Sequence, residues 1–145
     1  GLLRFATPTA GALRARLLLA EGQVAAAQQT IDAELAALER AGVGNLEQRA
    51  EAWRTAGEIQ LAAGQPARAA SHAERALQAS TRAARDPNGS ARVGETRWLL
   101  ARALAAQGDA AAAQAQAARA ADALTRGAGA GHALSLAARA FANPR

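Results

Sequence analysis

The chain contains no cysteine, and aromatic residues make up only 3% of it. Without cysteine there is neither a disulfide nor a thiolate metal site, and the cellular compartment stays open. Strands favour branched and aromatic residues, which are scarce here, whereas the abundant alanine and leucine are good helix formers. The composition therefore predicts an all-α fold.

Lysine is also missing, so all 17 basic residues are arginine, against 12 acidic residues and a formal net charge of +5. Together with the excess of alanine and glycine, this is typical of the codon usage of a GC-rich genome, which we favour over selection for arginine chemistry. The acidic residues are interspersed, and no run of five like charges occurs. Dedicated nucleic-acid binding is therefore not expected.

No apolar run is long enough to span a bilayer, so a soluble domain without membrane insertion is expected. At 145 residues the chain fits one domain with a continuous core. Residues 1–8 are expected to form an N-terminal extension without the layout of a signal peptide, and the missing initiator methionine suggests a processed or excised fragment. The cytoplasm is slightly favoured as the compartment, with the periplasm left open.

Apolar residues recur at helical spacing along the rest of the chain and predict seven helices. In the second break Asn45 is expected to cap the next helix, and in the fourth Gly89 is expected to adopt a positive φ. In the last break Gly129 is expected to be an exposed linker position that tolerates a larger side chain. The breaks lie at Gly22, 41–45, Gly64, 86–90, Gly108 and 127–131.

Three of the breaks place helical hairpins in register, because Gly22, Gly64 and Gly108 are separated by 42 and 44 residues. Such self-similarity is typical of a solenoid of stacked hairpins. Small residues stand seven positions before and five positions after each glycine, at Ala15, Gly57, Ala101, Ala27, Ala69 and Ala113. Twelve positions after it stand Glu34, Ala76 and Ala120. The predicted repeats cover residues 9–40, 46–85 and 91–126, with a cap at 131–141, in one domain over 9–145.

The middle repeat carries Trp53, Gly57, Gly64, Ala69 and Ala76 in a pattern that resembles the tetratricopeptide repeat family. It departs from that family at two places, since Ala56 replaces the usual leucine and Gln60 the usual aromatic residue, and the third repeat has Trp98 one position late. The period exceeds the usual 34 residues. The chain therefore resembles the longer-helix variety, as in kinesin-light-chain-like arrays and the helical arrays of bacterial regulators and kinases.

The resemblance implies a right-handed α-solenoid whose first helices line a concave groove that binds a peptide or a partner's helix. The Lys and Asn positions with which some family members hold a C-terminal carboxylate are not reproduced, although Arg16, Arg54 and Arg102 can hold an acidic group in a fork. The groove residues that the resemblance implies are Leu13, Arg16 and Leu19 from the first repeat, Glu51, Arg54, Thr55 and Glu58 from the second, and Glu95, Trp98, Leu99 and Arg102 from the third.

No motif for catalysis, a cofactor or a metal is found, and no enzyme is predicted. His72 and His132 are sixty residues apart, without neighbouring ligands, and are expected at solvated positions. The serines belong to no nucleophile motif, and neither a P-loop nor a GxGxxG sequence is present. Trp53 is assigned to the core, whereas Trp98 is left open between core and groove.

Several arginines gather near the junction of the second and third repeats. They could form an anionic docking patch, but long arginine stems that shield an alanine-rich core are the favoured interpretation. These arginines are Arg75, Arg82, Arg85, Arg92 and Arg97.

The leading functional hypothesis is a protein-interaction scaffold, within a larger bacterial regulatory or assembly protein. The alternative is an effector-sensing domain that binds a small ligand inside the superhelix; nucleic-acid binding through arginine is less expected. The N-terminal hairpin is rich in leucine, so we expect it to be covered by residues 1–6, or docked on a second copy or an upstream domain. Its exposed apolar residues would be Leu2, Leu3, Phe5, Leu13, Leu17, Leu18 and Leu19.

Overall fold

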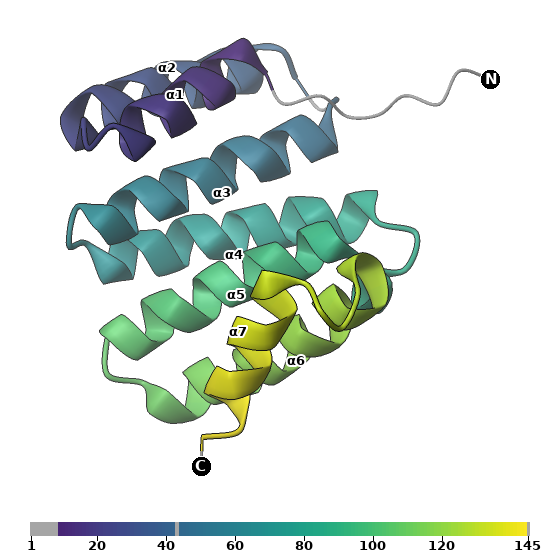
Figure 1. Ribbon diagram of the computed structural model, residues 1–145. Helices are drawn as coiled ribbons and strands as arrows, with labels where there is room; N and C mark the ends of the chain where they lie inside the picture. The colour runs from purple at the N-terminus through teal and green to yellow at the C-terminus, as the bar shows by residue number, and fades with distance from the viewer. Residues whose placement is uncertain (1–8, 43, 145) are drawn as a thin grey trace.

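The computed structural model describes residues 9–42 and 44–144, so the expected N-terminal extension 1–8 lies outside the described residues. Over these ranges the chain is all-helical and has no strand (Figure 1). The predicted all-α fold and seven helices are confirmed there. The elements are α1 (Ala10–Ala20), α2 (Val24–Arg40), α3 (Leu46–Ala62), α4 (Pro66–Ala83), the 3-10 turn η1 (Pro87–Gly89), α5 (Ala91–Ala106), α6 (Ala110–Ala128) and α7 (Ala133–Ala142).

The three short turns share one conformation. Gly22, Gly64 and Gly108 have φ angles of +78°, +74° and +87°, a left-handed region that glycine enters without a Cβ clash. In each turn the amide after the glycine donates to a carbonyl oxygen of the last helical turn, as in a Schellman motif. These bonds join Gln23 to Leu18, Gln65 to Gln60 and Asp109 to Leu104. The predicted turns are therefore confirmed.

Side-chain caps fix the start of three helices. Thr9, Ser90 and Asp109 each accept a hydrogen bond of 3.1 to 3.3 Å from the backbone N–H three residues further on. Such a cap satisfies one of the N–H groups that has no partner within the helix. The starts of α1, α5 and α6 are thus set by local sequence.

The break at 41–45 differs from the prediction. Asn45 itself has a left-handed φ of 59° and makes no side-chain cap, because in that conformation it ends the loop rather than accepting from α3. Gly42 takes the left-handed position after α2, with φ of +85°. The loop is held instead by Arg49, which donates to the carbonyl oxygens of Leu38 and Gly44 at 2.9 and 3.1 Å.

Gly89 also differs from the prediction, since it is not among the glycines with positive φ. It ends η1, a 3-10 turn whose right-handed backbone needs no such angle, and the Asp86 carboxylate accepts from the Asn88 amide there. The space at Gly89 is nevertheless tight. A Cβ at this position would lie 2.7 Å from an oxygen of the Asp86 carboxylate.

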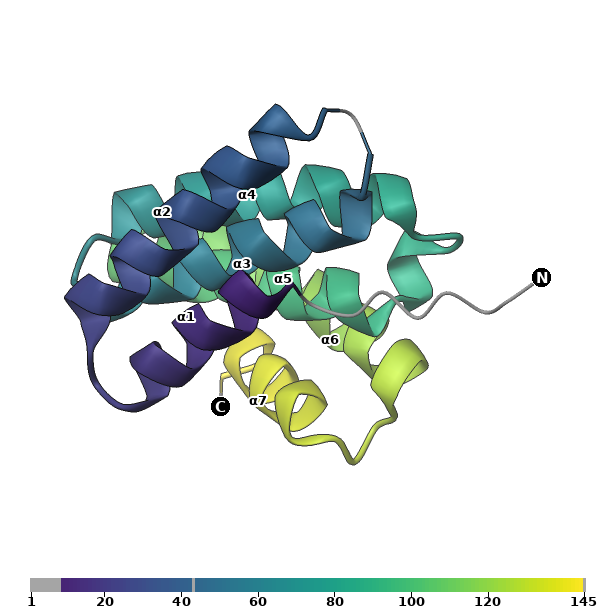
Figure 2. The ribbon, with the colours of Figure 1, turned by 90° about the horizontal axis from the view of Figure 1, so that it is seen from above.

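Neighbouring helices pack in chain order, each against the next, and α1, α3, α5 and α7 also contact one another in sequence. Figure 1 shows α1 in front of α2 at the top and α3, α4 and α5 as successive rows below them, with α7 crossing in front of α5 and α6. In Figure 2 the helices α1 and α7 lie toward one edge and α2 and α4 toward the other. The first helix of each hairpin therefore lies next to the first helix of the following one.

The small residues of the repeat are where helices approach. Those seven positions before and five after each turn glycine are all buried. Glu34 is half-buried at the position that Ala76 and Ala120 fill with no exposed surface. The core divides into three clusters along the chain, which join α1 and α2 to α3, α4 to α5, and α6 to α7.

Candidate functional site

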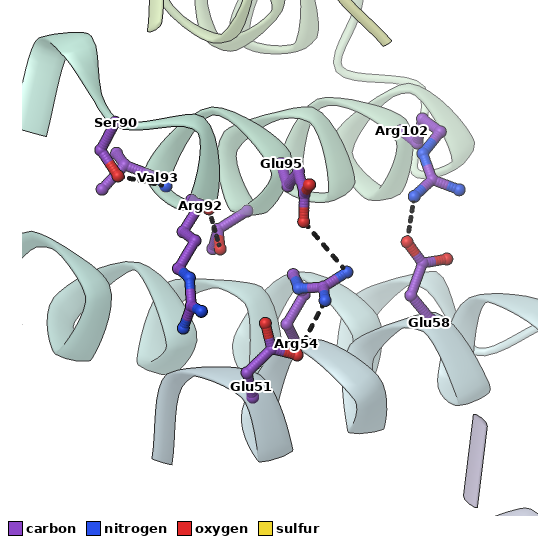
Figure 3. Close-up of polar contacts among 9 residues, drawn as sticks. Glu51, Arg54, Glu58, Ser90, Arg92, Val93, Glu95 and Arg102 are labelled. Atoms are coloured by element: carbon purple, nitrogen blue, oxygen red, sulfur yellow. Dashed lines mark hydrogen bonds and ion pairs between the residues drawn. The ribbon is translucent and has the colours of Figure 1, made fainter. Parts of the chain in front are cut away.

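The charged residues predicted for the groove lie mainly between α3 and α5. Arg54 of α3 pairs with Glu51 at 2.8 Å within its own helix and reaches Glu95 of α5 at 3.6 Å (Figure 3). One turn further along, Glu58 of α3 pairs with Arg102 of α5. We call these five residues the α3–α5 ladder. Their charges are matched to one another, so the ladder holds two first helices together and leaves little net charge.

A hollow of about 260 Å³ opens where α1 meets α3. Two of its polar groups, Arg54 and Glu58, belong to the α3–α5 ladder. Arg16 is exposed and has no ion pair within the described residues. The residues that line this α1–α3 hollow are Arg16, Leu19, Ala20, Arg54, Thr55 and Glu58. Five of them were predicted as groove residues, and the structure brings them together.

The floor of the α1–α3 hollow carries an unsatisfied hydroxyl. Thr55 is only 1% exposed, and its Oγ1 has no hydrogen-bond partner among the described residues. A buried polar group without a partner costs free energy. Thr55 is therefore not displayed on the inner face as predicted, because its hydroxyl is buried beneath the hollow.

One further predicted groove residue is wrong. Leu99 has no exposed surface and packs in the cluster with Ala69 and Ala73 of α4, because its position on α5 faces the preceding hairpin. Leu13 is 45% exposed, and its predicted place in the groove stays a prediction.

Trp98 is covered by the last helix. Its ring meets that of Phe141 of α7 edge to face, with centroids 5.7 Å apart, and packs beside the cluster of Ala120, Leu124 and Ala138. The Arg102 guanidinium lies 5.8 Å from the same ring. Trp98, which the sequence left open between core and groove, therefore lies in neither and packs in the contact between α5 and α7.

The arginines near the second junction do not act as one free patch. Arg97 is only 6% exposed and donates to the Gln116 side chain at 3.0 Å, and burial, followed by the charge of Arg119, lowers the pKa of its guanidinium. Arg75 lies 4.8 Å from the Trp53 ring. Trp53 is itself half-buried, so its assignment to the closed core is wrong.

The two histidines have different surroundings. His72 is half-buried against Trp53, with ring centroids 5.3 Å apart, and its Nδ1 has no partner within the described chain. Burial lowers the pKa of His72, an effect that Asp32 opposes and that Arg75 and Arg68 support. The predicted solvated position is therefore wrong for His72.

His132 is exposed, as predicted, and caps α7 by accepting from the Leu134 amide at 3.2 Å. Over the described ranges no three His, Cys, Asp or Glu side chains gather as metal ligands would. No described helix has both the length and the hydropathy to cross a membrane.

A second, larger hollow of about 830 Å³ was not predicted and lies at α6, α7 and η1. Two of its three arginines already have partners: Arg126 pairs with Asp86 at 3.1 Å, and Arg139 donates to Thr125 at 3.1 Å. The alanine-rich α6 sequence gave no signal for it, because the hollow forms only where α7 folds back. It is lined by Asn88, Ala118, Arg119, Ala121, Asp122, Thr125, Arg126, Arg139, Ala142 and Asn143.

A comparison with protein-family models, with curated proteins and with solved structures found no match for this chain. The function is therefore inferred from the geometry of the fold and of the two hollows alone.

Proposed function

We propose that the chain is a helical-repeat module of the tetratricopeptide type that binds a peptide or a partner's helix in the α1–α3 hollow. Three observations support the repeat architecture. The turns at Gly22, Gly64 and Gly108 share one conformation, the small residues at fixed distances from them are buried, and each hairpin packs mainly on its neighbours. Such nearest-neighbour packing is the property of solenoids, which present extended surfaces for binding.

The observation that carries the binding proposal is the chemistry of the α1–α3 hollow. It combines a cation on Arg16, which has no ion pair within the described residues, with an apolar wall from Leu19. The α3–α5 ladder fixes Arg54 and Glu58 on its far side. A peptide with a carboxylate for Arg16 and an apolar side chain for Leu19 would complement both.

The alternative functions receive less support. A small-ligand sensor needs an enclosed, mostly apolar pocket of about 300–1,000 Å³. The hollow between α3, α4 and α5 is about 60 Å³, and the hollow at α6 and α7 is lined mainly by polar and charged residues. A nucleic-acid interface would need arginines that are free to contact phosphate, whereas Arg97 is buried and bonded to Gln116.

The test uses short peptides selected by phage display against the wild-type chain. Selected peptides should compete with one another and should bind Arg16→Glu about tenfold more weakly or worse, because a matched charge becomes a like charge. Thr55→Val should leave peptide binding unchanged and thermal stability unchanged or higher, since it removes a buried, unsatisfied hydroxyl that the peptide does not contact.

The matched control is Arg68→Glu, an equal charge change at an exposed position on α4 outside the α1–α3 hollow. Peptides that bind Arg16→Glu and Arg68→Glu as tightly as the wild type would overturn the assignment of the hollow. A failure to select any competing peptides would count against peptide binding altogether.

A further inference from the structure

A second surface lies on the outer face of α1, away from the α1–α3 hollow. Leu13 and Leu17 stand one helical turn apart and are 45% and 65% exposed. They are two of the three large hydrophobic residues that are exposed within the described chain. Leu17 and Leu13 therefore form an apolar stripe on the first helix that no described residue covers.

The repeat register shows that this face is buried elsewhere. Counting back from the turn glycine, Leu13 corresponds to Thr55 and Leu99, which are 1% and 0% exposed. Leu17 corresponds to Ile59 and Ala103, both with no exposed surface. The same face of a first helix is thus closed in the second and third hairpins and open only in the first.

What closes it in the other hairpins is a helix. Leu99 and Ala103 of α5 pack in the cluster that contains Ala69, Ala70 and Ala73 of α4. Ile59 of α3 packs in the cluster that contains Ala27 and Ile31 of α2 and Ala12 and Ala15 of α1. In both cases helices of the preceding hairpin lie on the face, so the outer face of α1 corresponds to a surface that packs against helices.

Arg14 distinguishes this face from the buried ones. It occupies the register position of Ala56 and Leu100, which are 2% and 4% exposed, yet it is exposed itself and has no ion pair within the described ranges. A helix packed here would cover a cation where the other hairpins bury an apolar side chain. An unpaired buried charge is costly, so the covering helix must supply a carboxylate.

The same residue argues against two other occupants. Two copies of the chain packed through Leu13 and Leu17 would bring both copies of Arg14 into one contact, where like charges repel. The segment 1–8 carries Arg4 as its only charged residue and so offers no carboxylate. The complementary occupant is therefore a helix that lies outside residues 1–145 and carries acidic residues.

We propose that Ala10, Leu13, Arg14 and Leu17 form a docking surface, the α1 outer face, for an amphipathic partner helix with a small apolar stripe and an Asp or Glu opposite Arg14. Small residues on that stripe would let the two backbones approach as α4 and α5 do. This surface is separate from the α1–α3 hollow, so either proposal can fail without the other.

The test uses two synthetic helical peptides of about 18 residues, or five turns. Both carry the same alanine and leucine stripe, flanked in one by Glu and in the other by Lys. Fluorescence anisotropy should show that the wild-type chain binds the Glu peptide about tenfold or more tightly than the Lys peptide. Arg14→Glu should reverse that preference, and the double variant Leu13→Ser, Leu17→Ser should lose binding to both peptides.

Leu136→Ser is the matched control, because Leu136 is 52% exposed on α7 at the other end of the chain. It should bind both peptides as the wild type does, and circular dichroism should show that all variants keep their helices. Equal affinity for the two peptides, or binding that survives the double leucine change, would overturn the proposal. The proposal would also be overturned if sedimentation showed a dimer that dissociates only in the double leucine variant, because a second copy would then be the occupant.

Discussion

At the scale of single residues, Gly57 marks a close approach of α3 to the helices α4 and α5. A Cβ there would lie 2.8 Å from the Leu99 Cδ2 and 3.3 Å from the Ala69 carbonyl oxygen. Leu99 is fully buried and the oxygen is backbone, so neither can easily move. We expect Gly57→Leu to lower the free energy of unfolding by about 1–3 kcal/mol or more through overpacking, measured by urea denaturation.

The control for this change is Gly131→Leu, since a Cβ at Gly131 meets nothing within 4 Å and its φ is not positive. Gly129, expected to tolerate a larger side chain, is a poor control because its φ of +103° would strain any L residue. The interpretation of Gly57 would fail if the two leucine variants unfolded at the same urea concentration.

His72 should make stability depend on pH. Its ordinary pKa is 6.5, and burial lowers that pKa in the folded chain, so the unfolded chain binds the proton more readily. The stability that neutral His72 contributes is present in full above about pH 6.5 and is lost as the pH falls through the lower folded pKa. Thermal melts should therefore show a loss of stability on acidification that His72→Gln reduces.

The matched variant for this titration is His132→Gln, because His132 is exposed at the start of α7. Its melting temperature should fall with acidification as that of the wild type does. A pH dependence that is identical in the wild type and His72→Gln would show that the burial of His72 does not affect its protonation.

Residue-scale features were predictable from the sequence where the backbone alone decides them. Gly22, Gly64 and Gly108 were found because only glycine enters their conformation easily, and the spacing repeats it. Asn45 and His72 were not found, because their surroundings are set by Arg49 and Trp53, which approach through the fold rather than through local sequence.

At the scale of elements, the contact between α5 and α6 depends on a glycine that the sequence placed in a linker. Gly127 lies in the last turn of α6, and a Cβ there would be 2.3 Å from the Ala91 amide nitrogen and 2.8 Å from the Gly89 carbonyl oxygen. Both are backbone atoms. We expect Gly127→Ala to lower the free energy of unfolding by about 1–3 kcal/mol, by chemical denaturation, despite alanine's higher helix propensity.

Gly131→Ala gives the comparison, because it adds the same methyl group where no atom lies within 4 Å. If Gly127→Ala were as stable as Gly131→Ala, the end of α6 could not be packed on the start of α5. The run of alternating glycine and alanine from 127 to 131 looks uniform in the sequence. Only the fold distinguishes a tight contact at Gly127 from a turn at Gly129.

For the charged residues of the α3–α5 ladder, their place on one helix was predictable from the sequence, but their partners on the other helix were not. The family resemblance placed Glu51, Arg54 and Glu58 on one side of this helix, and in the structure all three take part in the α3–α5 ladder. Their pairing with Glu95 and Arg102 depends on how α3 and α5 are aligned, which no local pattern encodes. Such half-exposed pairs contribute about 0–1 kcal/mol each, so they orient helices more than they stabilise them.

At the scale of the whole molecule, the order of packing followed from the short turns, because two helices joined by a few residues must lie side by side. The alanine-rich core, by contrast, contains few large side chains that could anchor a prediction of which faces meet. Leu99 was misplaced for that reason. The position of α7 was predicted only as a cap, since nothing local in the sequence pairs Phe141 with Trp98.

The position of α7 over α5 and α6 leads to a prediction about stability and association. Removing residues 130–145 would uncover the cluster of Ala120, Ala121 and Leu124 on α6 and the Trp98 ring on α5, which α7 now covers with Leu134, Ala138 and Phe141. A helical domain whose buried apolar surface is uncovered loses stability and tends to associate. We expect the truncated chain to melt at a lower temperature and to sediment with a mass that rises with concentration.

Phe141→Ala separates the two consequences, because it removes the edge-to-face contact with Trp98 while keeping the rest of α7. Its melting temperature should fall, because the free energy of unfolding decreases by at most about 3–5 kcal/mol when a half-buried phenylalanine is truncated. The variant should nevertheless remain monomeric. A truncated chain that stayed monomeric at all concentrations and melted with the wild type would mean that α7 rests on the surface without closing it. The end of the helical stack would then be α6 itself.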